Sequence, residues 1–285
     1  MSAFARFLRA AGRTALILAL SALGTVFLTR LAPGYFDDAR EMDSEYGQNA
    51  RSSLAGELRA EPSAFSSAEH AFRDLANGNL GQSRQFGVPV SDLIRERAGI
   101  TFQTLVHGIG YAWLIAFCAA LPCSAIRRRR FLSGVPFTVL MAVPAGAMAT
   151  LCLLRNQGGP VLVLTLLLAA RDFKFLERTL RQAWDAPHLL QARAQGLRLH
   201  QLVGSFLLPN IISKLLALAI LSWITALSAI VPIEVIFGVP GLGQLAWSGA
   251  MNRDLPVLIG VTLIMAGAVG LAGAFSQQFR SMETA

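Results

Sequence analysis

The side chains that most often carry out chemistry are few in this sequence and widely separated. The four histidines do not recur at the short spacings that hold a metal ion, and the three cysteines all lie inside apolar runs. No G-x-x-x-x-G-K-[ST] loop for nucleotide phosphates occurs, and neither does an H-E-x-x-H helix or a G-x-S-x-G turn. The sequence therefore predicts no catalytic site, no metal site and no cofactor in this chain.

The most distinctive polar stretch is 190–210, which reads LQARAQGLRLHQLVGSFLLPN and lies between two strongly apolar segments. Gly196 can adopt a left-handed or an open conformation at little steric cost, so it is predicted to end a short helix over 191–195. A second, amphipathic helix is predicted beyond it, because apolar residues recur at helical spacing at Leu199, Leu202, Val203 and Phe206. The stretch is therefore expected to form two helical pieces at a fixed angle beside a membrane surface.

The composition places this stretch in an integral membrane protein. Of the 285 residues, 54% are hydrophobic and 15% are charged, and the mean hydropathy is +0.51. A soluble domain usually has about 25% charged residues. The length allows several spans and one sizeable loop. We therefore expect an all-α integral membrane protein with about six transmembrane helices.

The apolar runs indicate where these helices lie. Spans are predicted at 14–29, 101–126, 131–154, 160–170, 211–231 and 255–275. Pro144 is expected to kink the third span. The fourth run is shorter than the roughly 20 residues a span needs, so its helix is expected to continue past Arg171 into the cytoplasm. The first run could also be a signal peptide, but it is long for one and no cleavage site adjoins it.

These spans divide the chain into regions. Residues 1–30 form a cytoplasmic head and the first span, and 31–100 form a polar extracytoplasmic loop region with helical periodicity at 67–76. Residues 101–275 form a five-span core that contains a cytoplasmic loop at 171–210 and an outer loop at 232–254. Residues 276–285 form a polar cytoplasmic tail.

The charge distribution supports cytoplasmic ends. Lys and Arg are in excess in the inner segments, most densely at 127–130, whereas acids are in excess outside. This asymmetry accounts for the net charge of +8 without nucleic acid, because no basic patch with interleaved aromatic residues occurs in an aqueous segment. The predicted spans contain no mid-membrane carboxylate of the kind that ion-coupled transporters need. A solute moved by this chain would therefore need an energy source in another protein.

The 190–210 stretch resembles the EAA loop of binding-protein-dependent ABC importer permeases, a motif of the form E-A-A-x-x-x-G-x(9)-I-x-L-P. The matching residues are Ala192, Gly196, Leu208 and Pro209. Three positions differ, where the family has Glu, Ala and Ile and this chain has Leu190, Gln191 and Phe206. Five further stretches resemble the dipeptide, oligopeptide and nickel branch of that family, in the same order, at 30–34, 78–83, 88–90, 233–243 and 251–256.

The resemblance implies a permease subunit of a bacterial inner membrane importer for peptides or similar small solutes, including nickel chelates. Its partners would be a second permease in a heterodimer, two ATP-binding subunits that hold ATP and Mg, and an extracytoplasmic solute-binding protein. Ala192 and Gly196 would shape a coupling helix and its exit turn, ahead of Leu208 and Pro209. Candidates for ATPase contact by position are Asp185, Arg193, Gln195, Arg198 and His200.

The stretch 237–243 would make an outer turn at the pore mouth, formed by Phe237, Pro240, Gly241 and Gly243. A Pro-Gly turn without any contact role is an equal alternative. The glutamate missing at Leu190 would fit a partner ATPase with an altered groove, or a non-transporting scaffold subunit derived from such a permease. A short connection between the third and fourth spans, with only small residues after Pro144, leaves the size of the solute open. A membrane-embedded hydrolase has no residues at catalytic spacing to support it.

Overall fold

A computed structural model gives the fold of the chain and describes residues 3–31, 79–125, 130–155, 158–187 and 201–283, together with 189, 191 and 195–197. The described residues form helices joined by short connections, and the only β pairing among them is an isolated bridge between Gln82 and Pro89. The predicted all-α class is therefore confirmed. The predicted helix at 67–76 and the arginine run at 127–129 lie outside the described residues.

The helices follow the predicted apolar runs, with bounds that differ in places. They are α1 (Ala3–Leu31), α4 (Val90–Ala125), α5 (Arg130–Ala142), α6 (Ala145–Leu154), α7 (Pro160–Trp184), the π-helix η3 (Leu202–Leu207), α10 (Leu208–Phe237), α11 (Leu242–Met251) and α12 (Leu255–Glu283).

Three described helical stretches are long and apolar enough to cross a membrane, namely Val90–Ser124, Leu202–Phe237 and Leu255–Ala274. The pair α5 and α6 would make a fourth span if the two helices count as one. The apolar part of α1, Gly12–Leu28, is shorter, and α7 is apolar only in its first half. An integral membrane protein is therefore confirmed for the described helices, while the count of six spans stays a prediction.

The break at Pro144 is larger than the predicted kink. Proline has no backbone N–H to continue the helix and fixes its own φ, here at −61° with an extended ψ of 143°. The axes of α5 and α6 consequently differ by 94°. The predicted third span is thus a pair of helices, and α6 packs against α10 and α7.

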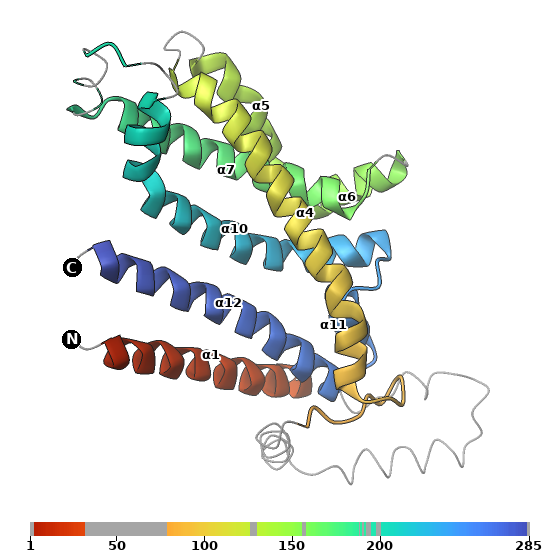
Figure 1. Cartoon of the computed structure of the whole chain (residues 1–285). Helices are drawn as coiled ribbons and strands as arrows, with labels where there is room; N and C mark the ends of the chain where they lie inside the picture. Colours follow the sequence, from red (N-terminus) through yellow and green to blue (C-terminus); the bar gives the residue numbers. More distant parts are fainter. Residues whose placement is uncertain are drawn as a thin grey trace, which may run out of the picture.

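The helix α7 packs against α4, α10 and α5 in the upper part of the helix layer (Figure 1). Two apolar clusters lie along these helices. One joins α4, α6 and the first half of α7 to the second half of α10, and the other joins α4 and the second half of α7 to 189–218. The helices α1 and α12 pack side by side at the edge.

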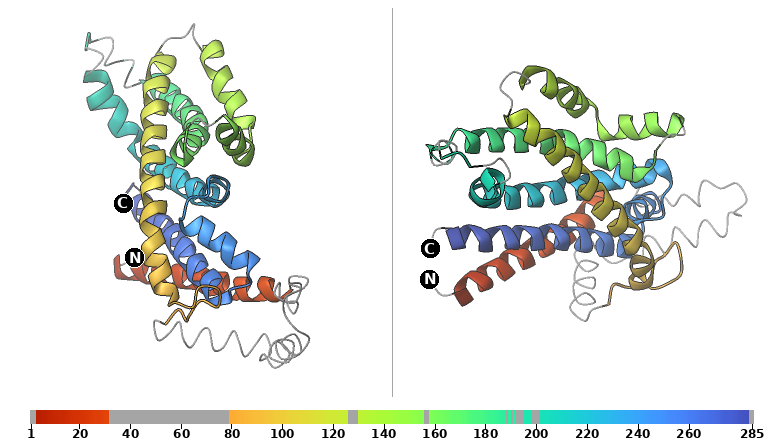
Figure 2. Two further views of the ribbon diagram at one scale, coloured as in Figure 1. Left: turned by 90° about the vertical axis from the view of Figure 1, so that its right-hand side faces the viewer. Right: turned by 45° about the horizontal axis from the view of Figure 1, so that its top comes forward.

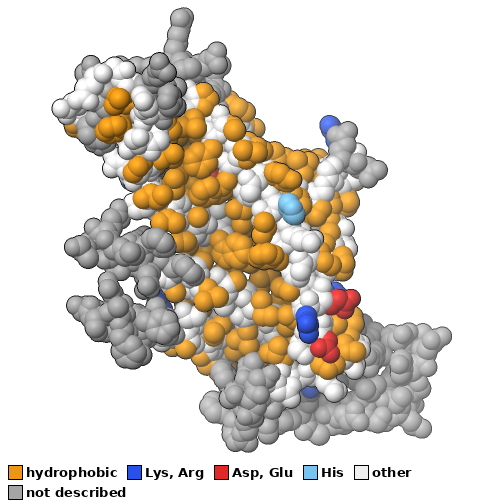
Figure 3. Space-filling view, in the orientation of Figure 1, with side chains coloured by type: hydrophobic (Ala, Val, Ile, Leu, Met, Phe, Trp, Pro, Cys, Tyr) orange, Lys and Arg blue, Asp and Glu red, His pale blue; other side chains and the backbone are white. Residues whose placement is uncertain are grey.

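The connections gather at two opposite ends of the helix layer. The start of α1, the end of α12 and the described residues between α7 and α10 lie at one end, which we name the inner end after the predicted topology. The helix α11 and residues 79–89 lie at the other, the outer end (Figures 1 and 2). Hydrophobic side chains cover most of the face between them, as Figure 3 shows from the side of α4. This arrangement matches a body surrounded by lipid, because apolar surface of this extent is unusual on a soluble monomer.

The segments predicted as an outer loop and as a polar tail are both largely helical. The outer loop expected at 232–254 contains the last turn of α10 and the whole of α11, and α12 continues through the expected polar tail as far as Glu283. Polarity in these segments signals the membrane boundary, and helical structure does not stop there.

Candidate functional site

The inner connection between α7 and α10 begins at Asp185, which follows the last residue of α7 and is exposed. A backbone hydrogen bond from Gln195 to the carbonyl of Gln191 (3.2 Å) forms one helical turn ahead of Gly196. Gly196 has a φ of +79°, the left-handed conformation predicted for it, and is exposed. Among the described residues, no atom lies within 4 Å of the place where a Cβ would stand. The glycine is therefore favoured here by its positive φ and not by lack of space.

Three leucines fasten this connection to the helices. Leu189, Leu202 and Leu207 are at most 4% exposed, and they share one apolar cluster with Ala116 of α4 and Phe173 of α7. Burying a leucine side chain stabilises by about 1.5–3 kcal/mol. The exposed turn at Gly196 is thus flanked on both sides by leucines that are buried against the helices.

The second helical piece of the connection is a π-helix, and it corrects the predicted buried face. A π-helix pairs residue i with i+5, and the two buried leucines of η3, Leu202 and Leu207, are five apart. Phe206, which was placed on the buried face by α-helical spacing, is 37% exposed. Leu208 and Pro209 lie in the first turn of α10, and both are exposed.

Four predicted coupling residues lie outside the described residues, namely Ala192, Arg193, Arg198 and His200, and so does Leu190 at the position of the missing glutamate. The described members of the set on the connection, Asp185, Gln195 and Gly196, are all exposed. The proposed contact role of the set stays a prediction.

At the outer end, a tight turn follows α10 as predicted. Phe237 is the last residue of α10, and Gly238 caps it in the left-handed conformation with a φ of 64°. Pro240 is exposed, whereas Gly241 and Gly243 are buried. The two glycines thus face the protein interior, and only the tip of the turn faces outward.

The group that the two glycines face is the carboxylate of Glu234, which is fully buried in the last turns of α10. Its Oε1 accepts a hydrogen bond from the Thr101 hydroxyl (2.7 Å) and its Oε2 accepts one from the backbone N–H of Gly243 (2.7 Å). The Thr101 hydroxyl oxygen in turn accepts from the N–H of Leu242 (2.8 Å). One carboxylate therefore joins α4 to the end of α10 and the start of α11.

The glycines leave room for this carboxylate. A Cβ at Gly241 would collide with the Glu234 carboxylate, and one at Gly243 would come within 2.7 Å of the Cα of Val231. Their role in the turn is close approach of backbone to a buried charge, which only glycine permits here.

A second buried carboxylate, Asp254, fixes residues 79–89 to the start of α12. Its Oδ2 accepts hydrogen bonds from the Ser83 hydroxyl (2.5 Å) and the backbone N–H of Gln85 (3.1 Å). Ser248 of α11 also donates to the Gln85 side chain (3.0 Å). Two motifs far apart in the sequence, at 78–83 and 251–256, thus meet at this contact.

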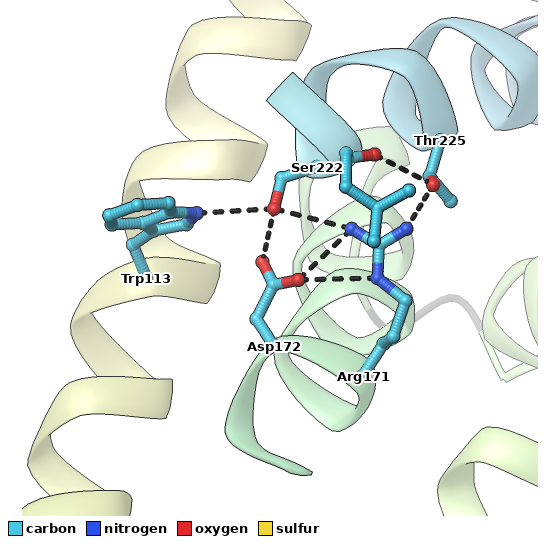
Figure 4. A network of polar contacts seen from close by, with 6 residues as sticks. Trp113, Arg171, Asp172, Ser222 and Thr225 are labelled. Atoms are coloured by element: carbon cyan, nitrogen blue, oxygen red, sulfur yellow. Dashed lines mark hydrogen bonds and ion pairs between the residues drawn. The ribbon is translucent and has the colours of Figure 1, made fainter. Parts of the chain in front are cut away.

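A third polar group lies between the two apolar clusters, at the middle of α7 and of α10 (Figure 4). Asp172 is fully buried, and its Oδ2 accepts a hydrogen bond from the Ser222 hydroxyl (2.8 Å). Arg171 donates to the other oxygen of Asp172 from Nε (3.3 Å) and from one terminal nitrogen (3.0 Å). It also donates to the hydroxyls of Ser222 and Thr225. Trp113 of α4 donates to Ser222 (3.3 Å).

The prediction that the spans lack mid-membrane carboxylates is therefore wrong for Asp172. Glu234 lies inside an apolar helical stretch that can span a membrane, and Asp172 packs against the centre of that same stretch. The predicted span limits put Glu234 in the outer loop at 232–254 and Asp172 in the cytoplasmic extension of the fourth helix. The signal that could have found them is pairing, because a charged residue beside a long apolar run needs a polar partner on another helix.

Comparisons with known proteins fit this architecture. Residues 108–280, more than half of the chain, match the family described as "Binding-protein-dependent transport system inner membrane component". A Brucella suis biovar 1 (strain 1330) protein named as a peptide permease is 29% identical over 223 residues, which are 67% of this chain and 70% of that protein.

Two Staphylococcus aureus proteins are also similar. The nickel import system permease protein NikB (strain USA300) is 25% identical over 219 residues, 69% of this chain and 64% of that protein. The metal-staphylopine import system permease protein CntB (strain Mu50) is 31% identical over 107 residues, 38% of this chain and 34% of that protein.

Proposed function

Because the chain belongs to the family of binding-protein-dependent transport system inner membrane components, we propose that it forms half of the solute pore of an ATP-driven importer and couples that pore to ATPase subunits through 190–210. Its place as a permease component of the peptide and nickel branch follows from the family and from the relatives. The full assembly would contain a second permease, two ATP-binding subunits and an extracytoplasmic solute-binding protein.

The observation that carries the coupling role is the construction of the inner connection. It presents an exposed turn at Gly196, and Leu189, Leu202 and Leu207 anchor it to α4 and α7. The connection also continues directly into α10 through η3. A force applied to the turn would therefore reach α4, α7 and α10 together. An exposed loop without buried anchors would transmit nothing, because it would bend instead.

The proposed mechanism is a population shift between inward-open and outward-open arrangements. Closure of the partner ATPases on ATP moves the docked connection as a rigid unit, and α7 and α10 follow it. The polar group of Arg171, Asp172 and Ser222 holds these two helices together at mid-length. The ATPase subunits supply ATP and Mg binding, so this chain contributes movement and a path.

The outer end supplies a stiff platform for the solute-binding protein. Glu234 ties α10 to α4 and α11, and Asp254 ties residues 83–85 to the start of α12, in each case by hydrogen bonds to a buried carboxylate. Such bonds are about twice as strong as those between neutral groups. Peptides and chelated nickel are the proposed solutes, after the names of the relatives.

The test is reconstitution of the complete importer in proteoliposomes, with the subunits that co-purify from native membranes. Gly196→Val should abolish ATP-driven uptake while the subunit still inserts and assembles, because valine disfavours a φ of +79°. The control is Gly204→Val, at an exposed glycine of the same connection with an ordinary φ and no atom within 4 Å of the added Cβ.

Wild-type uptake by the Gly196→Val importer would refute the coupling role. Loss of uptake in both variants would show that any bulk on the connection is harmful, and would also refute the role of the turn. A non-transporting scaffold predicts that no solute stimulates ATP hydrolysis even in the unmodified assembly.

A further inference from the structure

One face of α7 carries a row of cations that the proposed coupling does not use. Arg171, Lys174 and Arg178 recur at three- and four-residue spacings, so they lie above one another on one side of the helix. The opposite side contains the buried residues Phe173, Leu176 and Leu180. The exposure of the row increases along the helix, from a half-buried Arg171 to an exposed Arg178.

The row begins at the middle of the helix layer. Arg171 lies at the centre of α7 and bonds to Ser222 and Thr225 near the centre of α10 (Figure 4). The helix α10 is part of a stretch that can span a membrane. Arg178 lies two turns further toward the inner end, beyond Lys174.

Lipid cannot be the neighbour of this row at mid-depth. Charged residues within membrane-spanning helices almost always face the protein interior or a water-filled cavity, since exposure to hydrocarbon is costly. An arginine near a helix end can extend to the lipid phosphates, but Arg171 is held at the centre by Asp172, Ser222 and Thr225. The face of the row therefore adjoins water or another subunit.

The charges of the row are only partly neutralised. Asp172 forms an ion pair with Arg171. Glu177, one turn after Lys174, forms its ion pair with Arg181, which is outside the row. No ion pair between residues that the structure describes involves Lys174 or Arg178. On α10, Lys214 adds a further cation beside the inner half of the row and donates to Gln182 of α7 (3.3 Å). A positive potential thus extends from mid-depth to the inner end.

We propose that Arg171, Lys174 and Arg178 line the solute path and bind a carboxylate group of the solute as it passes from mid-membrane to the inner face. This inference rests on the proposed function of uptake through this subunit. Lysine and arginine at successive turns offer a carboxylate consecutive hydrogen-bonded ion pairs. Arg171, fixed through Asp172, sets the start of the row, and Lys174 has the free charge nearest to mid-depth.

Both proposed solute types can carry the required group. A linear peptide ends in a carboxylate, and many metal chelators bind their metal through carboxylates. The common chemistry is a carboxylate on a small, water-soluble solute. Peptides whose C-terminus is an amide lack this group and serve as matched probes.

The first experiment asks whether Lys174 faces water. The native residues Cys118, Cys123 and Cys152 are replaced by serine, and Lys174→Cys is exposed to a membrane-impermeant thiol reagent in inside-out vesicles of the assembled importer. Labelling is expected. The control is Leu114→Cys, which stands beside Trp113 at the same depth on α4 and is 61% exposed on the apolar face. If the thiol reagent labels neither Lys174→Cys nor Leu114→Cys, the inference is refuted.

The second experiment measures transport with a free-acid peptide, the same peptide as its amide, and nickel bound to a carboxylate chelator. Lys174→Gln should raise KM for the free-acid peptide about tenfold, which corresponds to about 1.4 kcal/mol, and leave KM for the amide nearly unchanged. An increase with the peptide acid alone or with the chelate alone identifies which carboxylate source the row accepts. Arg155→Gln, an exposed cation just after α6, should alter neither.

The outcomes separate the two proposals. If the unmodified importer moves none of the three solutes under ATP, the proposed function fails. If it moves them and Lys174→Gln changes the KM values of acid and amide equally, the function stands and the carboxylate row is refuted.

Discussion

The two ends of this helix layer are held by different forces. At the outer end, Glu234 and Asp254 are fully buried, and each accepts hydrogen bonds from other elements at 2.5–3.1 Å. At the inner end, the connection between α7 and α10 is anchored by leucines, and no atom of the described residues lies within 4 Å of the place where a Cβ would stand at Gly196. Hydrogen bonds to buried charges fix both distance and direction, whereas apolar contact is non-directional.

This difference fits the proposed coupling, in which the inner end moves and the outer end holds. Leucines can repack over a short distance while they remain buried, so the inner end can follow a partner. A displaced donor at the outer end would leave a buried carboxylate unpaired, which is costly. Four substitutions test this contrast, and loss of stability is the common scale.

The largest loss is expected from Glu234→Ala. It leaves the Thr101 hydroxyl and the Gly243 N–H without an acceptor, at about 1–3 kcal/mol each. The measurement is the thermal unfolding midpoint of the purified protein in detergent. Glu234→Gln keeps one carbonyl oxygen in place and should lose less. A Glu234→Ala protein that unfolds like the unmodified one would show that the outer end is not held by this carboxylate.

Gly243→Ala should come next. The added methyl group would stand 2.7 Å from the Cα of Val231 and 2.9 Å from the Glu234 carboxylate, so backbone or carboxylate must shift. Overpacking of this kind costs about 1–3 kcal/mol. Gly99→Ala is the control, because it lies in α4 with open space around it and alanine favours a helix. Equal unfolding midpoints for the two variants would show that the added methyl group at residue 243 is not crowded by Val231 and Glu234.

A smaller and local effect is expected from Ser83→Ala. It removes one hydrogen bond to Asp254, at about 1.5 kcal/mol. The loop 83–89 should then open more often, and trypsin should cleave after Arg84 roughly tenfold faster. Ser248→Ala removes an exposed bond to the same loop and should change the rate little. Faster cleavage in the Ser248 variant than in the Ser83 variant would reverse the importance of the two contacts.

The smallest loss of stability is expected from Gly196→Ala. A positive φ costs a residue with a Cβ about 1–2 kcal/mol at most, and the exposed turn can relax because no neighbour opposes it. The unfolding midpoint should therefore barely change, while solute-stimulated ATP hydrolysis by the importer falls. If Gly196→Ala lowers the midpoint as much as Gly243→Ala does, the two ends are equally rigid and the contrast is wrong.

Local rules were enough for much of the chain. The apolar runs predicted the helices, because apolar side chains must be covered by lipid or by other helices along the whole run. Gly196 has the left-handed conformation that a residue without a Cβ can adopt at little steric cost. Asp185 and Gln195, candidates for contact with a partner by position, are both exposed. Helix bounds failed near Glu234 and at η3, where polarity and α-helical spacing were misleading guides.

The sequence by itself determined an all-α membrane protein without motifs for chemistry of its own. Composition and periodicity can be read along the chain without knowing which helices are in contact. Only the tertiary structure decided the polar contacts. Asp172 meets Ser222, Glu234 meets Thr101 and Asp254 meets Ser83, all across long separations. No periodicity encodes such pairs, since the partner of a buried charge depends on how whole helices pack.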